Sequence, residues 1–233
     1  MEKIQIISPE IPNGLEGMLR ELNCRIIATK EQKNLPAPER FHADLQAFAP
    51  DSHTLIAAPG VFDYYREALQ GTGIAVLRGN ADPGEHYPQR IAYNVARVKD
   101  RAYCLTEAVD PVIAEELRKR GVALVNVTQG YAACSLVPVG AGIITSDKGI
   151  AEKAKDCLFF DPKQITLPGY ENGLIGGCFC RIGEELSVLC GDPSLCDRGD
   201  ALTEFFARHG VMLKTVAGQP LFDFGGSIFL EGM

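Results

Sequence analysis

A pattern of two strands, a helix and a third strand recurs along this chain, and it limits the possible folds more than any other feature. The clearest copy predicts strands over 91–98 and 101–107, a helix over 110–121 and a strand over 122–127. In this copy Asp110 and Pro111 form a helix start and Gly121 a typical helix stop. Three more copies begin near residues 42, 134 and 176. A repeat of this kind decides the architecture before any single residue does.

The fifth copy is divided between the two ends of the sequence. The N-terminal segment supplies a strand (3–9), a helix (14–22) and another strand (24–30), so one strand is missing. The apolar stretch 223–230 is left over, and placing it before 3–9 completes the unit. We therefore predict an α/β fold with a single domain over 1–233. It is a five-bladed α/β propeller of ββαβ units with pseudo-fivefold symmetry, whose first blade is closed by the C-terminal strand.

An open, doubly wound α/β sheet is the alternative fold, because strands and helices also alternate there. That fold places one strand before each helix. Here two strands precede each helix, which favours the ring.

Composition and charge exclude several classes of function. The chain has 46% apolar and 23% charged residues, as soluble globular proteins do. No apolar run reaches the roughly 18 residues of a membrane span, and the N-terminal stretch lacks a signal-peptide pattern, so we expect a cytoplasmic location. A net charge of −7 argues against nucleic acid as a partner and favours a cationic small molecule. In a reducing compartment the eight cysteines should be free thiols.

Several short strings of the sequence resemble a known superfamily. Five ββαβ units are the architecture of the penteins, which modify guanidino groups. The stretches FHADLQ, YPQRIAYN, VNVTQGYAACS, IITSD and GYENGLIGG are similar to an uncharacterised bacterial family of that fold. The resemblance implies chemistry without a cofactor or a metal. In that chemistry a cysteine attacks the guanidinium carbon, a histidine transfers protons and acidic residues hold the nitrogens.

The H-x-D pattern of the superfamily has a match in His42 and Asp44. The resemblance makes His42 the catalytic histidine and Asp44 a substrate-binding residue. Cys134 lies at the corresponding position two units later and is the expected nucleophile. Residues two apart on a strand share a face, so His42 and Asp44 are expected to point the same way. Taken alone, H-x-D is a weak signal, and a cysteine such as Cys134 is more often a packed core thiol.

The remaining candidates depart further from the superfamily pattern. In the characterised enzymes the cysteine lies near the C-terminus, so here the order of units would be cyclically shifted. Asp223 is then the nearest match to the acidic residue expected before the histidine, and Asn94 occupies the equivalent start of another unit. Glu171 lies on a glycine-flanked loop that is expected to enter the same end of the ring, although a simple turn is the plainer reading. Cys178 is the rival nucleophile, and with Cys180 it is otherwise read as a core thiol.

Two functions of different classes follow. The first is a hydrolase or amidinotransferase that acts on a guanidine or amidine through a covalent intermediate on Cys134. The second is a non-catalytic ring that binds a ribosome or protein partner, as a translation factor of this fold does. A shallow apolar outer face would also permit a homo-oligomer. Signatures of nucleotide hydrolysis, zinc proteolysis and serine-esterase chemistry do not occur in the sequence.

Overall fold

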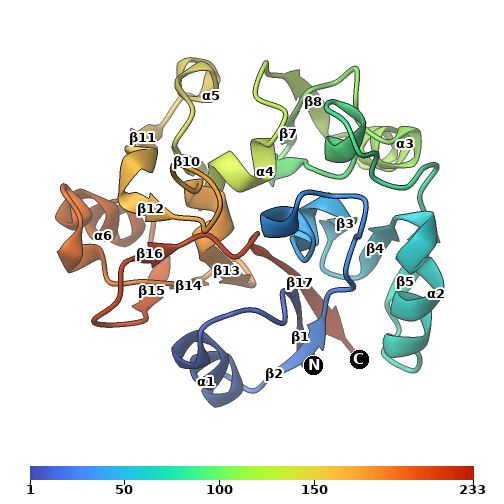
Figure 1. Cartoon of the computed structure of the whole chain (residues 1–233), viewed down its shortest axis with the longest axis horizontal. Helices are drawn as coiled ribbons and strands as arrows, with labels where there is room; N and C mark the ends of the chain where they lie inside the picture. Colours follow the sequence, from blue (N-terminus) through green and yellow to red (C-terminus); the bar gives the residue numbers. More distant parts are fainter.

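Five three-stranded sheets and one two-stranded sheet make up the computed structural model, which describes residues 1–233. In Figure 1 the sheets surround the middle of the molecule and the longer helices lie toward its periphery. None of the sheets closes into a barrel. The chain is therefore a mixed α/β protein built from several small sheets.

Each three-stranded sheet repeats one strand order. The first strand runs antiparallel to the second, and the second runs parallel to the third across a helix. The sheets, each with its helix, are β17(Ser227–Gly232)-β1(Glu2–Ile7)-β2(Cys24–Ala28) with α1(Asn13–Glu21), β3(Ala47–Asp51)-β4(Thr54–Ala57)-β5(Ala75–Arg78) with α2(Pro59–Ala68), β6(Ala96–Val98)-β7(Arg101–Cys104)-β8(Ala123–Asn126) with α3(Pro111–Lys119), β9(Leu136–Val139)-β10(Gly142–Thr145)-β11(Cys157–Phe159) with α5(Lys148–Lys153), and β13(Phe179–Ile182)-β14(Leu186–Leu189)-β15(Met212–Thr215) with α6(Gly199–Arg208).

The helices form where the sequence gives a start signal and an apolar stripe. In α3 the side chain of Asp110 accepts a hydrogen bond from the Val112 N–H, and Ile113 and Leu117 are buried one turn apart. A crossover helix is what allows the second and third strands of each sheet to run parallel.

The C-terminal strand pairs with the first strand of the chain, as the leftover strand in the sequence predicts. The register runs from Glu2 opposite Gly232 to Ile7 opposite Ser227. Both chain ends therefore lie in one sheet, and they are close together in Figure 1. This pairing satisfies backbone groups of β1 that would otherwise form an open sheet edge.

Two boundaries differ from the prediction. The stretch KQITL predicts the third strand of the fourth unit over 163–167, but the structure forms this strand as β11. That later stretch contains β12(Ile165–Thr166), which pairs with β16(Leu221–Phe222) in the separate two-stranded sheet. The helix α5 has only six residues, so the chain returns to the sheet one short turn earlier than expected.

Buried apolar side chains fill the spaces between neighbouring sheets rather than one central core. The largest cluster joins the first three units and includes Ile4, Leu55, Tyr65 and Leu117. A second cluster joins the fourth and fifth units through Val137, Phe179 and Phe206. No helix combines the length and apolar character required to cross a membrane.

The terminal pairing gives a test of stability. Leu230 on β17 opposes Ile4 and is fully buried, so Leu230→Ala should lower the free energy of unfolding by about 2–5 kcal/mol. Met212→Ala is the control, because Met212 is 61% exposed on β15 and should change stability by less than about 0.5 kcal/mol. Urea denaturation of the two variants makes the comparison. Equal losses would mean that β17 is not needed for a stable fold.

Candidate functional site

A short helical turn precedes the first strand of four units, and these turns carry most of the candidate residues. They are η2(Ala43–Leu45), η3(Gln89–Ile91), α4(Ala132–Ser135) and η5(Ile175–Cys178). The expectation that His42 and Asp44 share the face of a strand is therefore wrong. His42 caps η2 and Asp44 lies inside it, while Cys134 lies in α4. Strand periodicity missed these turns because their apolar residues run directly into the strands.

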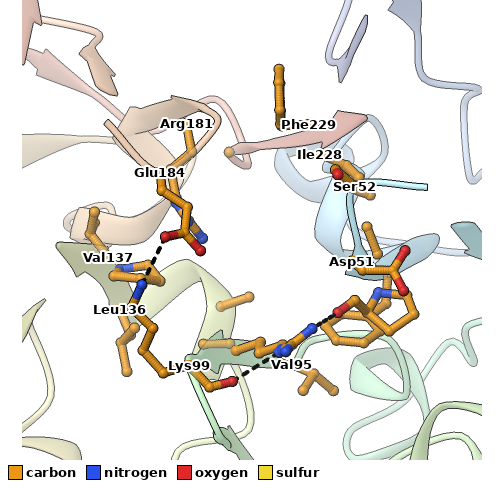
Figure 2. A pocket seen from close by; sticks show the side chains of 18 of the residues that line it. Asp51, Ser52, Val95, Lys99, Leu136, Val137, Arg181, Glu184, Ile228 and Phe229 are labelled. Carbon is orange, nitrogen blue, oxygen red and sulfur yellow. Dashed lines mark hydrogen bonds and ion pairs between the residues drawn. The ribbon is translucent and has the colours of Figure 1, made fainter. Parts of the chain in front are cut away.

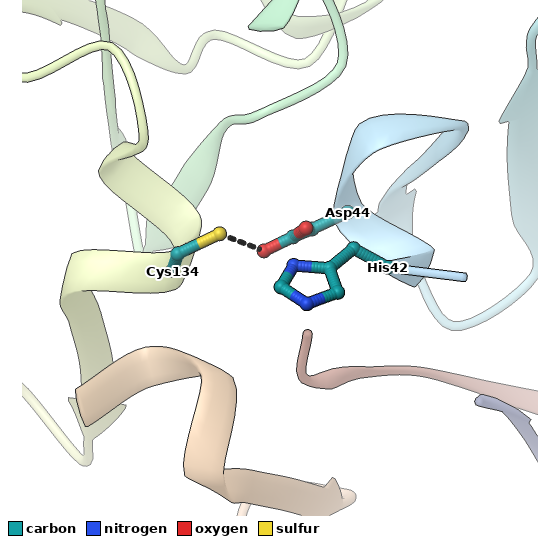
Figure 3. A group of neighbouring side chains, drawn as sticks. All are labelled: His42, Asp44 and Cys134. Atoms are coloured by element: carbon teal, nitrogen blue, oxygen red, sulfur yellow. Dashed lines mark hydrogen bonds between the residues drawn. The ribbon is translucent and has the colours of Figure 1, made fainter. Parts of the chain in front are cut away.

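The turns nevertheless bring the thiol, the imidazole and a carboxylate together. The Cys134 thiol donates a hydrogen bond to Asp44 Oδ2 at 2.8 Å. One ligand atom each from His42, Asp44 and Cys134 lie within 4.8 Å of one another. Figure 3 shows the imidazole of His42 beside the Asp44 carboxylate and facing the sulfur. Residues 90 positions apart in sequence thus form one buried centre, in which Cys134 is 2% and His42 4% exposed.

Asn94 fixes the position of the cysteine. Its Nδ2 donates to Cys134 Sγ at 3.2 Å, and its Oδ1 accepts the Ala133 N–H at 2.7 Å. The side chain is buried, so both polar atoms depend on these contacts. Asn94 therefore holds the thiol and the backbone of α4 in one orientation.

Asp223 reaches the same centre from the segment before β17. It is buried and accepts hydrogen bonds from the Leu174 and Gly225 N–H groups at 2.8 and 2.9 Å. Glycine is required where this segment meets its neighbours. A Cβ on Gly225, whose φ is +83°, would come within 2.2 Å of the His42 ring, and one on Gly177 within 1.8 Å of Asp223 Oδ1.

Burial and like charge keep the resting thiol protonated. The pKa of Cys134 is raised well above its usual value, first by burial and then by the charges of Asp44 and Asp223. Burial likewise raises the pKa of Asp44 to about 6, although His42 and the Cys134 hydrogen bond oppose the shift. The pKa of Asp223 is also raised by burial. The centre is thus short of positive charge.

Two atoms of the centre are buried without any hydrogen-bond partner, namely His42 Nδ1 and Asp44 Oδ1. Buried polar atoms in native proteins are nearly always paired. The two unpaired atoms are a carboxylate oxygen and a ring nitrogen. They fit a ligand that donates N–H groups beside the sulfur.

Two openings approach the centre. A small cavity of about 90 Å³ is lined by His42 and Asp223 together with Pro38, Phe41 and Leu167. A larger cavity of about 1020 Å³ is lined by the first strands of all five units and reaches Asp44 and Ala133 (Figure 2). Contact with this cavity explains why Asp44 as a whole is only half-buried while its Oδ1 atom is inaccessible.

A second carboxylate network lies next to the centre, and sequence patterns indicate it only weakly. Glu39 is buried, and its carboxylate accepts hydrogen bonds from the Tyr131 and Tyr170 hydroxyls and lies 3.7 Å from Arg90. The Glu39 carbonyl also accepts the His42 N–H at 3.0 Å. The network ties the loops before η2, α4 and η5 together. Its one available signal was the Gly-Tyr pair at 130–131 and again at 169–170.

The other candidates lie apart from this cluster of contacts. Glu171 is exposed in a turn, and its carboxylate makes no hydrogen bond or ion pair. Cys178 is fully buried in η5, and its thiol donates to the Leu174 carbonyl oxygen at 3.6 Å. Burial raises the pKa of Cys178 well above its usual value, and no imidazole or carboxylate is hydrogen-bonded to it.

The donors of the centre are also of the kinds that bind zinc. A thiolate, an imidazole and a carboxylate are common ligands of that ion, and the three lie close enough to share one. A metal ion would therefore compete with an organic ligand for the same atoms.

Solved structures of similar fold include a dimethylarginine dimethylaminohydrolase and two amidinotransferases. Dimethylarginine dimethylaminohydrolase from Pseudomonas aeruginosa, solved with citrulline, has a TM-score of 0.54 at 10% identity over 99% of this chain and 98% of its own. An amidinotransferase of saxitoxin biosynthesis from Microseira wollei has a TM-score of 0.58 at 12% identity over 99% and 94%. The inosamine-phosphate amidinotransferase of Streptomyces griseus has a TM-score of 0.56 at 14% identity over 94% and 78%.

At these identities the likeness shows the fold alone, which is the pentein fold. The chain belongs to a family of unknown function, DUF6873, whose model matches residues 6–229. None of the curated proteins matches the sequence.

The raised pKa of Asp44 predicts a dependence of stability on pH. The folded-state pKa of about 6 lies above the unfolded value near 3.9, so ionised Asp44 costs stability, and this cost develops as pH rises from about 4 to 6. Asp44→Asn should then be more stable than the wild type at pH 7.5, by at most about 3 kcal/mol, and the difference should shrink toward pH 4.

Urea denaturation at pH 4.5, 6 and 7.5 measures this difference, and Asp63→Asn on α2 is the control. Asp63 is exposed beside Arg66, so its removal should give no such trend. A loss of stability in Asp44→Asn at pH 7.5 would contradict the proposed electrostatic cost.

Proposed function

We propose that this chain is an enzyme that modifies a guanidine or amidine group of a small molecule through a covalent intermediate on Cys134. The observation that carries the proposal is the convergence of Cys134, His42 and Asp44 in one buried centre with unpartnered polar atoms. The shared fold with hydrolases and amidinotransferases of guanidino compounds supports the same kind of activity. In this proposal the five sheets are blades of one propeller domain, and the centre lies on its axis.

Two carboxylates account for recognition. A planar guanidinium offers N–H groups in pairs, and a carboxylate accepts two of them in a bidentate arrangement. Asp44 Oδ1 is free to accept, and the charge of Asp223 adds to the attraction. Glu171 is exposed and stays a predicted contact at the rim of the site.

Binding of a cation would activate the nucleophile. The pKa of Cys134 is high because Asp44 and Asp223 disfavour a second negative charge in a buried site. A bound guanidinium offsets both carboxylates and favours the thiolate, so the thiol ionises when the substrate is present. Asn94 Nδ2 donates to the sulfur and stabilises the same thiolate.

The reaction then balances with His42 as the proton carrier. The thiol proton passes to the imidazole, and the thiolate forms a C–S bond with the guanidinium carbon. The imidazolium returns this proton to the departing amine as the C–N bond breaks, which leaves a thiouronium on Cys134. Neutral His42 next takes a proton from water, and the hydroxide adds to the carbon. The C–S bond then breaks, the departing sulfur takes the proton back from the imidazolium, and the thiol and neutral His42 are regenerated. An acceptor amine in place of water gives amidino transfer.

Selective alkylation tests the recognition step. The cationic reagent 2-chloroacetamidine should modify Cys134 at least about tenfold faster than the neutral 2-chloroacetamide, because one carboxylate–cation contact is worth at least about 1.4 kcal/mol. Asp44→Asn should remove most of this preference. Peptide mass spectrometry identifies the modified thiol. Cys157 and Cys196 are half-buried and provide internal thiols that should show no preference.

The outcomes of this labelling separate the hypotheses. Equal rates for the two reagents at Cys134 would contradict the enzyme proposal. They would favour the alternative, a non-catalytic ring that binds a protein or ribosome partner. Faster labelling of Cys178 by the cationic reagent would support an enzyme in which Cys178, not Cys134, is the nucleophile.

Removing the nucleophile should abolish turnover without unfolding the protein. Cys134→Ala deletes one sulfur whose polar contacts are with Asp44 and Asn94, so the melting temperature should stay within a few degrees of the wild type. Ammonia or amine release is then measured with arginine-like substrates, with Cys157→Ala as the control that keeps activity. Unfolding of Cys134→Ala would identify the thiol as a structural core residue.

A further inference from the structure

The large cavity carries two arginines, and neither forms an ion pair with a carboxylate. Arg97 on β6 and Arg181 on β13 line the wall of this cavity of about 1020 Å³, and Figure 2 shows Arg181 with its neighbour Glu184. The guanidinium of Arg181 makes no hydrogen bond or ion pair. Arg97 Nε donates a hydrogen bond to the Lys99 carbonyl oxygen at 3.0 Å, and Arg97 Nη1 donates one to the Pro50 carbonyl oxygen. Both partners of Arg97 are therefore neutral.

The two arginines occupy equivalent places in their sheets. Each arginine lies on the first strand of its sheet, opposite the residue two positions before the end of the second strand. Arg97 lies opposite Ala102, and Arg181 lies opposite Ser187. The same place is held by Pro138 in the fourth unit and by Phe229 in the first, and both also line the cavity. The arginines therefore occupy the same register position in the cavity wall, and the equivalent positions of the first and fourth units hold uncharged residues.

Burial makes this arrangement costly as it stands. Arg181 is partly exposed and lines the cavity, and its pKa is lowered by burial and by the charge of Arg97. Glu184 attracts it, but that carboxylate is exposed and ion-paired with Lys99 at 2.8 Å. A buried charge of this kind is normally paired.

The acidic residues of the cavity are engaged elsewhere or lie at its exposed rim. Asp51 is ion-paired with Arg120 at 2.9 Å, and Glu231 accepts from the Ser52 hydroxyl at 3.0 Å. Asp100 and Glu185 are exposed. Asp44 belongs to the cysteine centre. None of them forms an ion pair with Arg97 or Arg181.

We infer that Arg97 and Arg181 form a binding site for a doubly charged oxyanion, namely phosphate or the phosphate group of a small monoester. Two guanidinium groups match the charge of a dianion and offer paired N–H donors to its oxygens. The cavity is far larger than one phosphate, so it has room for a monoester. The site is separate from the Cys134 centre and does not depend on the proposed reaction.

Calorimetric titration of the full chain tests the site. At pH 7.5 and constant ionic strength, inorganic phosphate and glycerol phosphate are titrated in turn, and tighter binding of the ester would identify a monoester as the preferred ligand. Arg181→Met should raise the Kd for phosphate at least about tenfold, because it removes charge-assisted hydrogen bonds. Arg118→Met, at an exposed arginine on α3, is the matched control and should leave the Kd unchanged.

Stability provides a second readout that a purely structural arginine would not give. Without phosphate, Arg181→Met should match or exceed the wild-type melting temperature, since it removes an unpaired charge beside Arg97. With phosphate, only the wild type and Arg118→Met should gain melting temperature. Arg97→Lys, which retains the positive charge, should keep part of the gain.

Three results would overturn the inference. They are no binding to the wild type, equal binding to Arg181→Met, and a loss of melting temperature in Arg181→Met without phosphate. Labelling of Cys134 by 2-chloroacetamidine should be unchanged in Arg181→Met, so failure of this site is distinguishable from failure of the proposed function.

Discussion

The pairing of the C-terminal strand with the first strand is the constraint on which the site depends. It closes the first sheet, and it also brings the segment before β17 against the turns that carry the reactive groups. Asp223 enters the centre on this segment, and Gly225 lets the backbone approach the His42 ring more closely than any side chain would allow. The last residues of the chain thus build a centre whose other members lie in its first two thirds. Fold and site are consequences of one strand pairing.

Electrostatics explains how such a centre can be stable and still reactive. Burial raises the pKa of the Cys134 thiol, and the charges of Asp44 and Asp223 raise it further, so the resting protein holds a neutral sulfur. The same carboxylates are the groups that a guanidinium would bind. In the proposed reaction, recognition and activation are coupled, because a ligand that supplies positive charge offsets the contribution of the two carboxylates to the raised pKa. A neutral ligand of similar shape would meet the protonated thiol.

The repeat and its closure could be predicted because both depend on apolar periodicity, which can be recognised in a single sequence. The sequence brought His42, Asp44 and Cys134 together through their places in the repeat, although the local geometry was wrong. The turns η2 and α4 replace the expected strand ends because a few apolar residues before a strand look the same in either conformation. The Glu39 network could not be predicted from the sequence, since its four members come from separate segments of the chain. Their meeting depends on how the units pack, which no local pattern encodes.

Charge is distributed unevenly along the central cavity. Asp44 lines it and contributes negative charge, whereas Arg97 and Arg181 line it without a carboxylate ion-pair partner. If both proposed sites bind ligands, a cation is drawn toward the sulfur and an anion toward the arginines, and no moving part is needed. An anion bound at the arginines would also be repelled by Asp44 less than an anion bound beside Cys134, since the interaction falls with distance. The protein therefore keeps a net charge of −7 while presenting a local site for negative charge.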